Sequence, residues 1–169
     1  MTSKALFLDR DGVINHNYGY VHNINKFKFR KGVIKGLKFL IKKNFYIFII
    51  SNQAGVGKGY FTKNNFFKLH IELKKILQNK NIFFDDVKYC FHHPEAKIAK
   101  YKKNCPYRKP GNKMIKELLL NWDINLYKSF MIGDNKSDFL CAKKSKIQFF
   151  YATNDFNKQI KKIINVKKK

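Results

Sequence analysis

Two aspartates that lie one residue apart, Asp9 and Asp11, carry the first recognisable chemistry of this sequence. They follow the apolar run 5–8, which has the composition of a buried strand, and they precede Gly12. If the strand continues through Asp11, both carboxylates share one face, because residues i and i+2 of a strand point the same way. Two such charges repel each other unless one is protonated or a cation such as Mg²⁺ lies between them. A surface turn is the alternative interpretation of so short a pattern.

Polar and charged residues also follow three later segments of the chain. The apolar run 45–50 leads into residues 51–59, whose hydroxyl, amides and glycines would suit an anion, although a plain glycine-rich loop fits equally well. Lys109 precedes Pro-Gly, which is a turn signal in front of an expected helix. The apolar run 129–132 leads into Gly-Asp and so places Asp134 at another strand end. Each of these signals is weak alone, and it indicates a functional site only if the fold brings the four segments together.

Amphipathic segments separate the expected strands and indicate the fold class. We expect strands at 5–8, 45–50, 87–91, 129–132 and 147–151, and helices at 31–43, 62–77, 112–121, 137–144 and 155–169. Strands that alternate with helices predict an α/β fold with a doubly wound, mostly parallel, Rossmann-like sheet. Right-handed crossovers would bring the carboxyl ends of the strands to one edge. The side chains expected at that edge are Asp9, Ser51, Lys109 and Asp134.

A pocket of this composition would suit phosphoryl transfer. A carboxylate such as Asp9 can attack phosphorus and form an aspartyl-phosphate, provided that a cation cancels the repulsion between the two anions. Asp134 would complete a Mg²⁺ site with Asp9 and Asp11. Ser51, Lys109 and backbone N–H groups would stabilise the phosphoryl oxygens. Asp11 would then protonate the leaving oxygen and later activate water.

Considered together, these motifs resemble the haloacid dehalogenase (HAD) superfamily. Its four ordered motifs are matched by Asp9-x-Asp11-Gly-Val, Ser51-Asn-Gln, Lys109-Pro and Gly-Asp134-x-x-x-Asp, so the likeness covers about residues 5–150. The longer stretches FLDRDGVIN, GYVH, SNQAGVGKGYFT, CFHHP and CPYRKP resemble its histidinol-phosphatase-like branch. The resemblance implies a Mg²⁺-dependent phosphatase that acts on a sugar bisphosphate, with a HAD core and no separate cap domain.

The resemblance also assigns roles to the matching positions. Asp9 would be the nucleophile and Asp11 the general acid and base, while Ser51 and Lys109 would stabilise the phosphoryl group. Asp9 and Asp134 would hold Mg²⁺ by their side chains, and Asp11 would do so largely through its backbone carbonyl.

Further residues are expected around the substrate. Those implied to bind it are Asn17, Tyr18, Gly19, Tyr20, Ser51, Asn52, Gln53, Ala54, Arg108 and Lys109. Asp138 would support the site from behind. By strand alternation, Arg10 would point away from both aspartates, and no role is expected for it.

Cysteine and histidine residues lie in a loop at 90–108. Relatives in this branch bind structural Zn²⁺ with a Cys-x-His pair followed by a Cys-x-Cys pair, so the resemblance implies Cys90, His92 and Cys105 as ligands. Tyr107 stands where the fourth cysteine is expected. Structural zinc normally has four protein ligands. Either these three hold zinc with a neighbouring histidine, water or Tyr107 as the fourth ligand, or the loop has lost the metal.

Composition sets further limits on function. The length of 169 residues suits one domain, residues 1–169, and the formal net charge is +25. Such a charge attracts phosphorylated substrates and raises a nucleic-acid hypothesis, but the lysines are spread along the chain. Compositional bias is therefore the favoured explanation, and no nucleic-acid partner is expected. A histidinol-phosphate phosphatase, a nucleic-acid 3′-phosphatase and a non-catalytic polyanion-binding module are the alternative functions.

Three cysteines, an odd number, do not form a disulfide framework and suggest a reducing cytoplasm. Cys141 is expected to be a buried residue of a helix.

No apolar segment is long enough to span a membrane, so no membrane contact is expected. The small, open site suggests a monomer.

Overall fold

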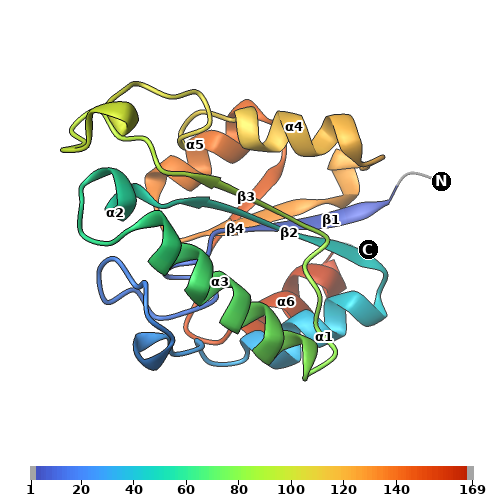
Figure 1. Cartoon of the computed structure of the whole chain (residues 1–169). Coiled ribbons are helices and arrows are strands. Elements are labelled where there is room, and N and C mark those ends of the chain that lie inside the picture. Colours follow the sequence, from blue (N-terminus) through green and yellow to red (C-terminus); the bar gives the residue numbers. More distant parts are fainter. Residues whose placement is uncertain (1–2, 167–169) are drawn as a thin grey trace.

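Five parallel strands form a single sheet in a computed structural model that describes residues 3–166 of the chain (Figure 1). The strands are β1 (Lys4–Leu8), β2 (Phe45–Asn52), β3 (Asp86–Cys90), β4 (Phe130–Gly133) and β5 (Gln148–Tyr151). Their order in the sheet is β3-β2-β1-β4-β5, so the chain moves outward from β1 first in one direction and then in the other. The prediction of a doubly wound, Rossmann-like α/β fold is confirmed.

Helices cover both faces of the sheet (Figure 1). The helices are α1 (Val33–Lys42), α2 (Ala54–Gly57), α3 (Lys63–Gln78), α4 (Lys113–Asn121), α5 (Lys136–Lys144) and α6 (Phe156–Val166), and the 3₁₀ turns are η1 (Ile24–Lys26), η2 (Ala99–Tyr101) and η3 (Leu126–Lys128). Helices α1, α3 and α6 lie on one face, and α4 and α5 lie on the other.

The central strand β1 is apolar on both sides because it has helices above and below it. Leu6 and Leu8 belong to the core cluster that contains α1, α3 and α6, whereas Ala5 and Phe7 belong to the cluster beneath α4 and α5. All four residues are fully buried. This two-sided burial explains why the strand reads as a continuous apolar run and not as an alternating one.

Most strand boundaries differ from the sequence-based expectation by one residue, and two strand ends matter for the site. Strand β1 ends at Leu8 and does not continue through Asp11, because the chain turns so that the carbonyl of Arg10 accepts backbone hydrogen bonds from Ile14 and Asn15. Strand β2, in contrast, continues through Asn52, two residues further than expected. The Asp-x-Asp pair therefore lies on a turn, while the first polar residues after the second apolar run belong to a strand.

The segments after β2 provide a short helix and a well-capped long one. The glycine-rich stretch forms α2. Thr62 caps α3: its side chain accepts from the Asn65 backbone N–H, and the Asn65 side chain accepts from the Thr62 N–H. The last predicted helix was expected to reach Lys169, but residues 167–169 lie outside the described part. Within residues 3–166, every helix is too short or too polar to span a membrane.

Candidate active site

A cavity of about 340 Å³ lies at the carboxyl edge of the sheet and collects most of the predicted site residues. Its predicted lining residues are Asp9, Asp11, Asn17, Gly19, Tyr20, Asn52, Gln53, Ala54 and Arg108. Gly55, Asn135 and Ser137 also line it and were not predicted. Tyr18 does not line the cavity; it is 61% exposed and stacks on His16. Ser51 and Lys109 do not line the cavity but contact Asp9 from the protein interior.

Asp9 is a buried carboxylate with two short contacts to the other predicted catalytic side chains. The Ser51 hydroxyl donates a hydrogen bond of 2.7 Å to its Oδ1, and the Lys109 Nζ lies 3.1 Å from its Oδ2. Burial raises the pKa of Asp9 to about 6, because desolvation outweighs the opposing effect of Lys109. The carboxylate predicted as the nucleophile is therefore buried, and its ionised form needs a nearby positive charge.

Lys109 is held from three sides beneath the cavity. Its Nζ lies 2.6 Å from Asp138 Oδ1 and donates to the Ile50 carbonyl at 2.8 Å. Asn52 forms two hydrogen bonds of 3.0 Å with the Lys109 backbone, one to its N–H and one to its carbonyl. Burial alone would lower the pKa of Lys109, but Asp9 and Asp138 together raise it, so the ammonium stays charged. Asp138 is fully buried, in agreement with its expected supporting position.

Asp134 approaches the Asp-x-Asp turn because Gly12 has no side chain. Gly12 has a φ of +80°, and a Cβ there would lie 2.0 Å from Asp134 Oδ2. Burial raises the pKa of Asp134. Oxygen atoms of Asp9, Asp134 and Asp138 lie within 4.8 Å of one another. Asp138 is fully buried and does not line the cavity, whereas Asp9 lines it and Asp134 is partly exposed. Asp9 and Asp134 are therefore the carboxylates available to a hard cation such as Mg²⁺, and the donor set fits that ion.

Arg10 lies toward Asp11, and the expectation that it points away from both aspartates was wrong. Its Nη2 lies 2.8 Å from Asp11 Oδ2, and its Nε lies 3.2 Å from Asp11 Oδ1. Strand alternation fails here because β1 has already ended at Leu8. The side chain is only 2% exposed, although no sequence signal marked it as buried.

The carboxylate of Asp11 accepts hydrogen bonds on both oxygens. Asn15 Nδ2 donates to Oδ1 at 2.9 Å, and Gln53 Nε2 donates to Oδ2 at 2.9 Å, in addition to the contacts from Arg10. The side chain of Asp11 is not among the three clustered carboxylates, which leaves its backbone carbonyl as the group that could face a cation. Asn15 had no predicted role.

Aromatic and basic residues surround the mouth of the cavity. Tyr20 has a φ of +49°, which is unusual for a residue with a side chain, and its ring lies 4.4 Å from that of Tyr60, centroid to centroid. Arg108 is half-buried, and burial lowers its pKa. Its Nη1 lies 3.5 Å from the His92 carbonyl, which joins the cavity to the cysteine loop.

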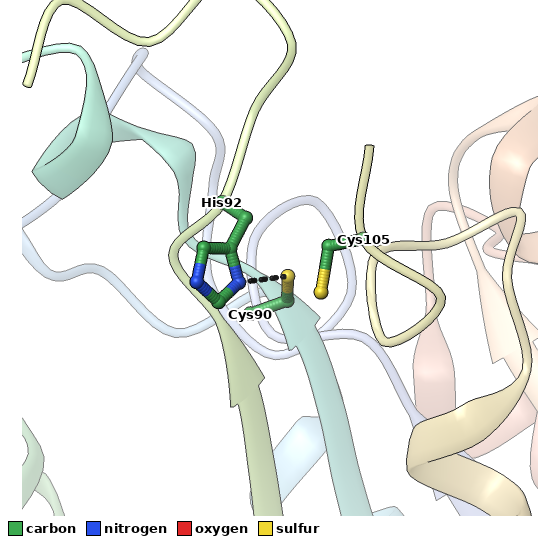
Figure 2. Close-up of side chains that lie close together, drawn as sticks. All are labelled: Cys90, His92 and Cys105. Carbon is green, nitrogen blue, oxygen red and sulfur yellow. Dashed lines mark hydrogen bonds between the residues drawn. The ribbon is translucent and has the colours of Figure 1, made fainter. Parts of the chain in front are cut away.

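The cysteine loop brings three metal-ligating side chains together at the end of β3. The side chains of Cys90, His92 and Cys105 point toward one another, with ligand atoms within 4.8 Å (Figure 2). His92 Nδ1 lies 3.7 Å from Cys90 Sγ. Burial raises the pKa of the Cys90 thiol to about 12, and the nearby Cys105 adds to this effect. Two thiols and an imidazole suit Zn²⁺ chemically.

Tyr107 does not act as a fourth member of this cluster. Its hydroxyl donates a 2.7 Å hydrogen bond to Glu117 Oε2, and Glu117 Oε1 lies 2.9 Å from Lys88 Nζ. The Tyr107 phenol therefore contacts the ion pair that Glu117 of α4 forms with Lys88 of β3. At the position where the fourth zinc ligand was expected, this chain has a hydrogen bond from the loop to α4.

Comparison with curated proteins identifies relatives that are all named as heptose-1,7-bisphosphate 7-phosphatases. A D-glycero-beta-D-manno-heptose-1,7-bisphosphate 7-phosphatase from Rhodopseudomonas palustris is 36% identical over 161 residues, which cover 95% of this chain and 89% of the relative. The protein of the same name from Escherichia coli is 34% identical, covering 85% and 75% of the two chains. A Burkholderia mallei protein named for the alpha anomer is 38% identical, covering 82% and 73%.

Comparisons with a family model and with solved structures agree on the fold. The family model described as polynucleotide kinase 3 phosphatase matches residues 6–165. A HAD-like phosphatase from Mesorhizobium loti superposes with a TM-score of 0.80 at 25% identity, covering 86% of this chain and 70% of the other. The heptose 1,7-bisphosphate phosphatase from B. bronchiseptica, solved with magnesium and phosphate, gives a TM-score of 0.79 at 21% identity and covers 93% and 84%.

Proposed function

The chain belongs to the heptose-1,7-bisphosphate 7-phosphatase family of HAD phosphoric monoester hydrolases, and we propose that it removes the 7-phosphate of D-glycero-D-manno-heptose 1,7-bisphosphate. The observation that supports this most directly is the position of Asp9. This carboxylate lines the cavity and contacts a hydroxyl and an ammonium that could stabilise a phosphoryl group.

The proposed reaction has two steps that share one phosphorus atom. An oxygen of Asp9 bonds to phosphorus while the bond between phosphorus and the C7 oxygen breaks, and Asp11 gives its proton to that oxygen. Water then attacks the aspartyl-phosphate, Asp11 takes the proton, and the bond between Asp9 and phosphorus breaks to release phosphate. The two carboxylates thus have different tasks, although they lie two positions apart.

Positively charged and hydroxyl groups stabilise the transferred phosphoryl group. Ser51 and Lys109 already contact Asp9, so they lie close to where its oxygens would meet phosphate. Asn52 and Asp138 fix the backbone and the ammonium of Lys109. This support limits the reorganisation needed during the reaction, which is how preorganised sites lower a barrier.

Two metal ions are part of the proposal. Asp9 and Asp134 would hold Mg²⁺ through their side chains, with the backbone carbonyl of Asp11, and the ion would reduce the repulsion between Asp9 and the phosphate. Cys90, His92 and Cys105 would hold Zn²⁺, with water completing the coordination, because the Tyr107 hydroxyl binds Glu117 instead.

The sugar would occupy the open part of the cavity. Asn17, Gly19 and Tyr20 lie on one side of it, and Ala54 and Arg108 also line it. The proposal further takes residues 1–169 as one domain that works as a cytoplasmic monomer. Its product would serve the synthesis of lipopolysaccharide heptose precursors.

A nucleic-acid 3′-phosphatase is the second candidate function. It is favoured by the match to the polynucleotide kinase 3 phosphatase family model and by the net charge of +25. A polyanion that binds through this charge alone would do so with a steep salt dependence and no turnover. Binding and hydrolysis of an oligonucleotide therefore have to be measured separately.

The test is phosphate release from three substrates, with and without Mg²⁺. The panel consists of heptose 1,7-bisphosphate, histidinol phosphate and an oligonucleotide with a 3′-phosphate, compared by kcat/KM at one ionic strength. We expect the heptose bisphosphate to be preferred by at least about a hundredfold, which corresponds to about 2.7 kcal/mol of transition-state stabilisation. A higher kcat/KM for either of the other substrates would replace the proposed substrate with that one.

A further inference from the structure

We propose that Arg10 is a positioning residue that, together with Gln53, holds the carboxylate of Asp11 in place for both proton transfers. The inference rests on the proposed function, because it deepens the role of Asp11 in the aspartyl-phosphate mechanism. Arg10 does not line the cavity and so acts through Asp11, without touching the substrate.

The first support is the burial of a permanent charge. Arg10 has the largest of the fully buried side chains in the described part of the protein. Burying a guanidinium is costly unless it is paired and hydrogen-bonded. Its partners are the two oxygens of Asp11, the Val21 carbonyl at 2.8 Å and Gln53 Oε1 at 3.1 Å, and the Phe66 ring lies 5.5 Å away. These contacts fix the guanidinium plane, and with it the orientation of Asp11.

The second support is a continuous chain of hydrogen bonds that joins the two catalytic carboxylates. Gln53 accepts from Arg10 through Oε1, and its Nε2 donates both to Asp11 Oδ2 and to Ser51 Oγ, each at 2.9 Å. Ser51 in turn donates to Asp9. Gln53 can satisfy all of these partners in only one orientation of its amide. Arg10 therefore fixes Gln53, and Gln53 fixes the side chains on both sides of the reacting phosphorus.

This arrangement has a chemical consequence for the first step. The fixed contacts hold the Asp11 carboxyl in one orientation, so they help it to deliver its proton to the leaving oxygen. A sugar alkoxide is a poor leaving group and needs that proton, whereas p-nitrophenolate leaves without it. Loss of Arg10 should therefore harm alkyl phosphates far more than aryl phosphates. A purely structural role would lower both rates equally.

The experiment compares Arg10→Met with the wild-type chain, using heptose 1,7-bisphosphate and p-nitrophenyl phosphate. Release of the leaving group is followed in single turnovers, which isolates the first step. We expect the rate with the heptose substrate to fall at least about tenfold more than the rate with the aryl substrate, within the range that general acid catalysis supplies. KM should change little, since Arg10 lies outside the cavity lining.

Two further variants separate positioning from stability. Leu77→Ala creates a core defect in α3 away from the cavity lining, so it should leave the ratio of the two rates unchanged. Gln53→Met removes the donor to Asp11 while Arg10 remains, and it should shift the ratio in the same direction as Arg10→Met. It supplies the test if the arginine variant does not fold.

The possible outcomes are distinct. Equal losses on both substrates in a folded variant of Arg10 or Gln53 would overturn the positioning role while leaving the proposed function intact. A wild-type chain that hydrolyses neither substrate would instead overturn the proposed function, and the role of Arg10 would fall with it.

Discussion

At the scale of single residues, Gly12 determines how closely Asp134, the second proposed metal carboxylate, can approach the turn that carries Asp9 and Asp11. Its φ of +80° strains any other residue, and the space of its missing Cβ is filled by Asp134. Gly59 offers a matched control: its φ is +77°, but nothing lies within 4 Å of its Cβ position. Comparing the two positions separates backbone strain from displacement of the carboxylate.

We predict that Gly12→Ala and Gly59→Ala each lose about 1–2 kcal/mol of stability, because both adopt the left-handed conformation. Only Gly12→Ala should also lose Mg²⁺ affinity, since its methyl group would displace Asp134. Urea denaturation measures the first effect, and titration of Mg²⁺ against phosphatase activity measures the second. Equal Mg²⁺ affinities in the two variants would show that Asp134 does not hold the ion.

We expect Asp9 to couple Mg²⁺ binding to pH. In the metal-free protein its pKa is raised to about 6, mainly by burial, so the fold favours the protonated carboxyl. The stability that protonated Asp9 contributes is thus present at low pH, and it is lost as the pH rises through about 6. Mg²⁺ requires the ionised form, so it should restore stability above that pH.

We therefore expect Mg²⁺ to raise the melting temperature clearly at pH 7.5 and little at pH 5. Apparent Mg²⁺ affinity should fall about tenfold per pH unit below the pKa of Asp9, because one proton competes with the ion. Asp9→Asn provides the control, since it should bind Mg²⁺ weakly at both pH values. An identical Mg²⁺-induced shift at pH 5 and pH 7.5 in the wild-type chain would argue against Asp9 as a ligand.

The gathering of the predicted catalytic residues at one edge of the sheet could be expected from the sequence, and the contacts of their neighbours could not. Asp9, Ser51 and Asp134 each follow an apolar run, and parallel strands bring such positions to one edge. The contacts of Arg10 depend on where β1 ends, because the turn after Leu8 breaks the alternation used to orient its side chain. A boundary error of a few residues was enough to reverse that prediction.

At the scale of elements, the loop between β3 and α4 links the cysteine cluster to Lys109, the proposed catalytic lysine. Cys105 and Lys109 lie four positions apart in it, and Arg108 between them lines the cavity and approaches the His92 carbonyl. Tyr107 joins the same loop to α4 through Glu117. The sequence indicated that a ligand had been replaced, but only the structure shows that the replacement holds the loop by a hydrogen bond.

We predict that Tyr107→Cys binds zinc about tenfold or more tightly than the wild-type chain, because a third thiolate would complete a closed tetrahedral site. Tyr107→Phe is the matched control: it should leave zinc affinity unchanged and lose about 1 kcal/mol of stability with the bond to Glu117. Competition with a chromophoric chelator measures affinity, and atomic emission gives the stoichiometry. A zinc-free wild-type chain purified with added zinc would contradict the three-ligand site.

At the scale of the whole molecule, the doubly wound sheet explains why weak local signals converge. Strand order β3-β2-β1-β4-β5 puts β1 at the centre, so the carboxyl ends of β2 and β4 flank the Asp-x-Asp turn. Element types and order followed from apolar periodicity, whereas the extension of β2 to Asn52 did not, because polar residues ended the apolar run. That extension matters, since Asn52 is the residue that holds the Lys109 backbone.

The net charge of +25 acts on the whole surface and does not select a substrate. A positive field attracts sugar phosphates and nucleic acids alike and weakens as salt screens it. Specificity must instead come from the groups that line the cavity. The charge therefore sets how readily phosphorylated molecules reach the site, and the cavity sets which of them react.

The most direct test of the central claim is phosphorus NMR of heptose 1,7-bisphosphate during turnover with Mg²⁺. We predict inorganic phosphate and heptose 1-phosphate as the only products, and no turnover by Asp9→Asn in a folded state. Accumulation of heptose 7-phosphate, or phosphate release by the Asp9 variant at the wild-type rate, would contradict an enzyme that uses Asp9 to remove the 7-phosphate.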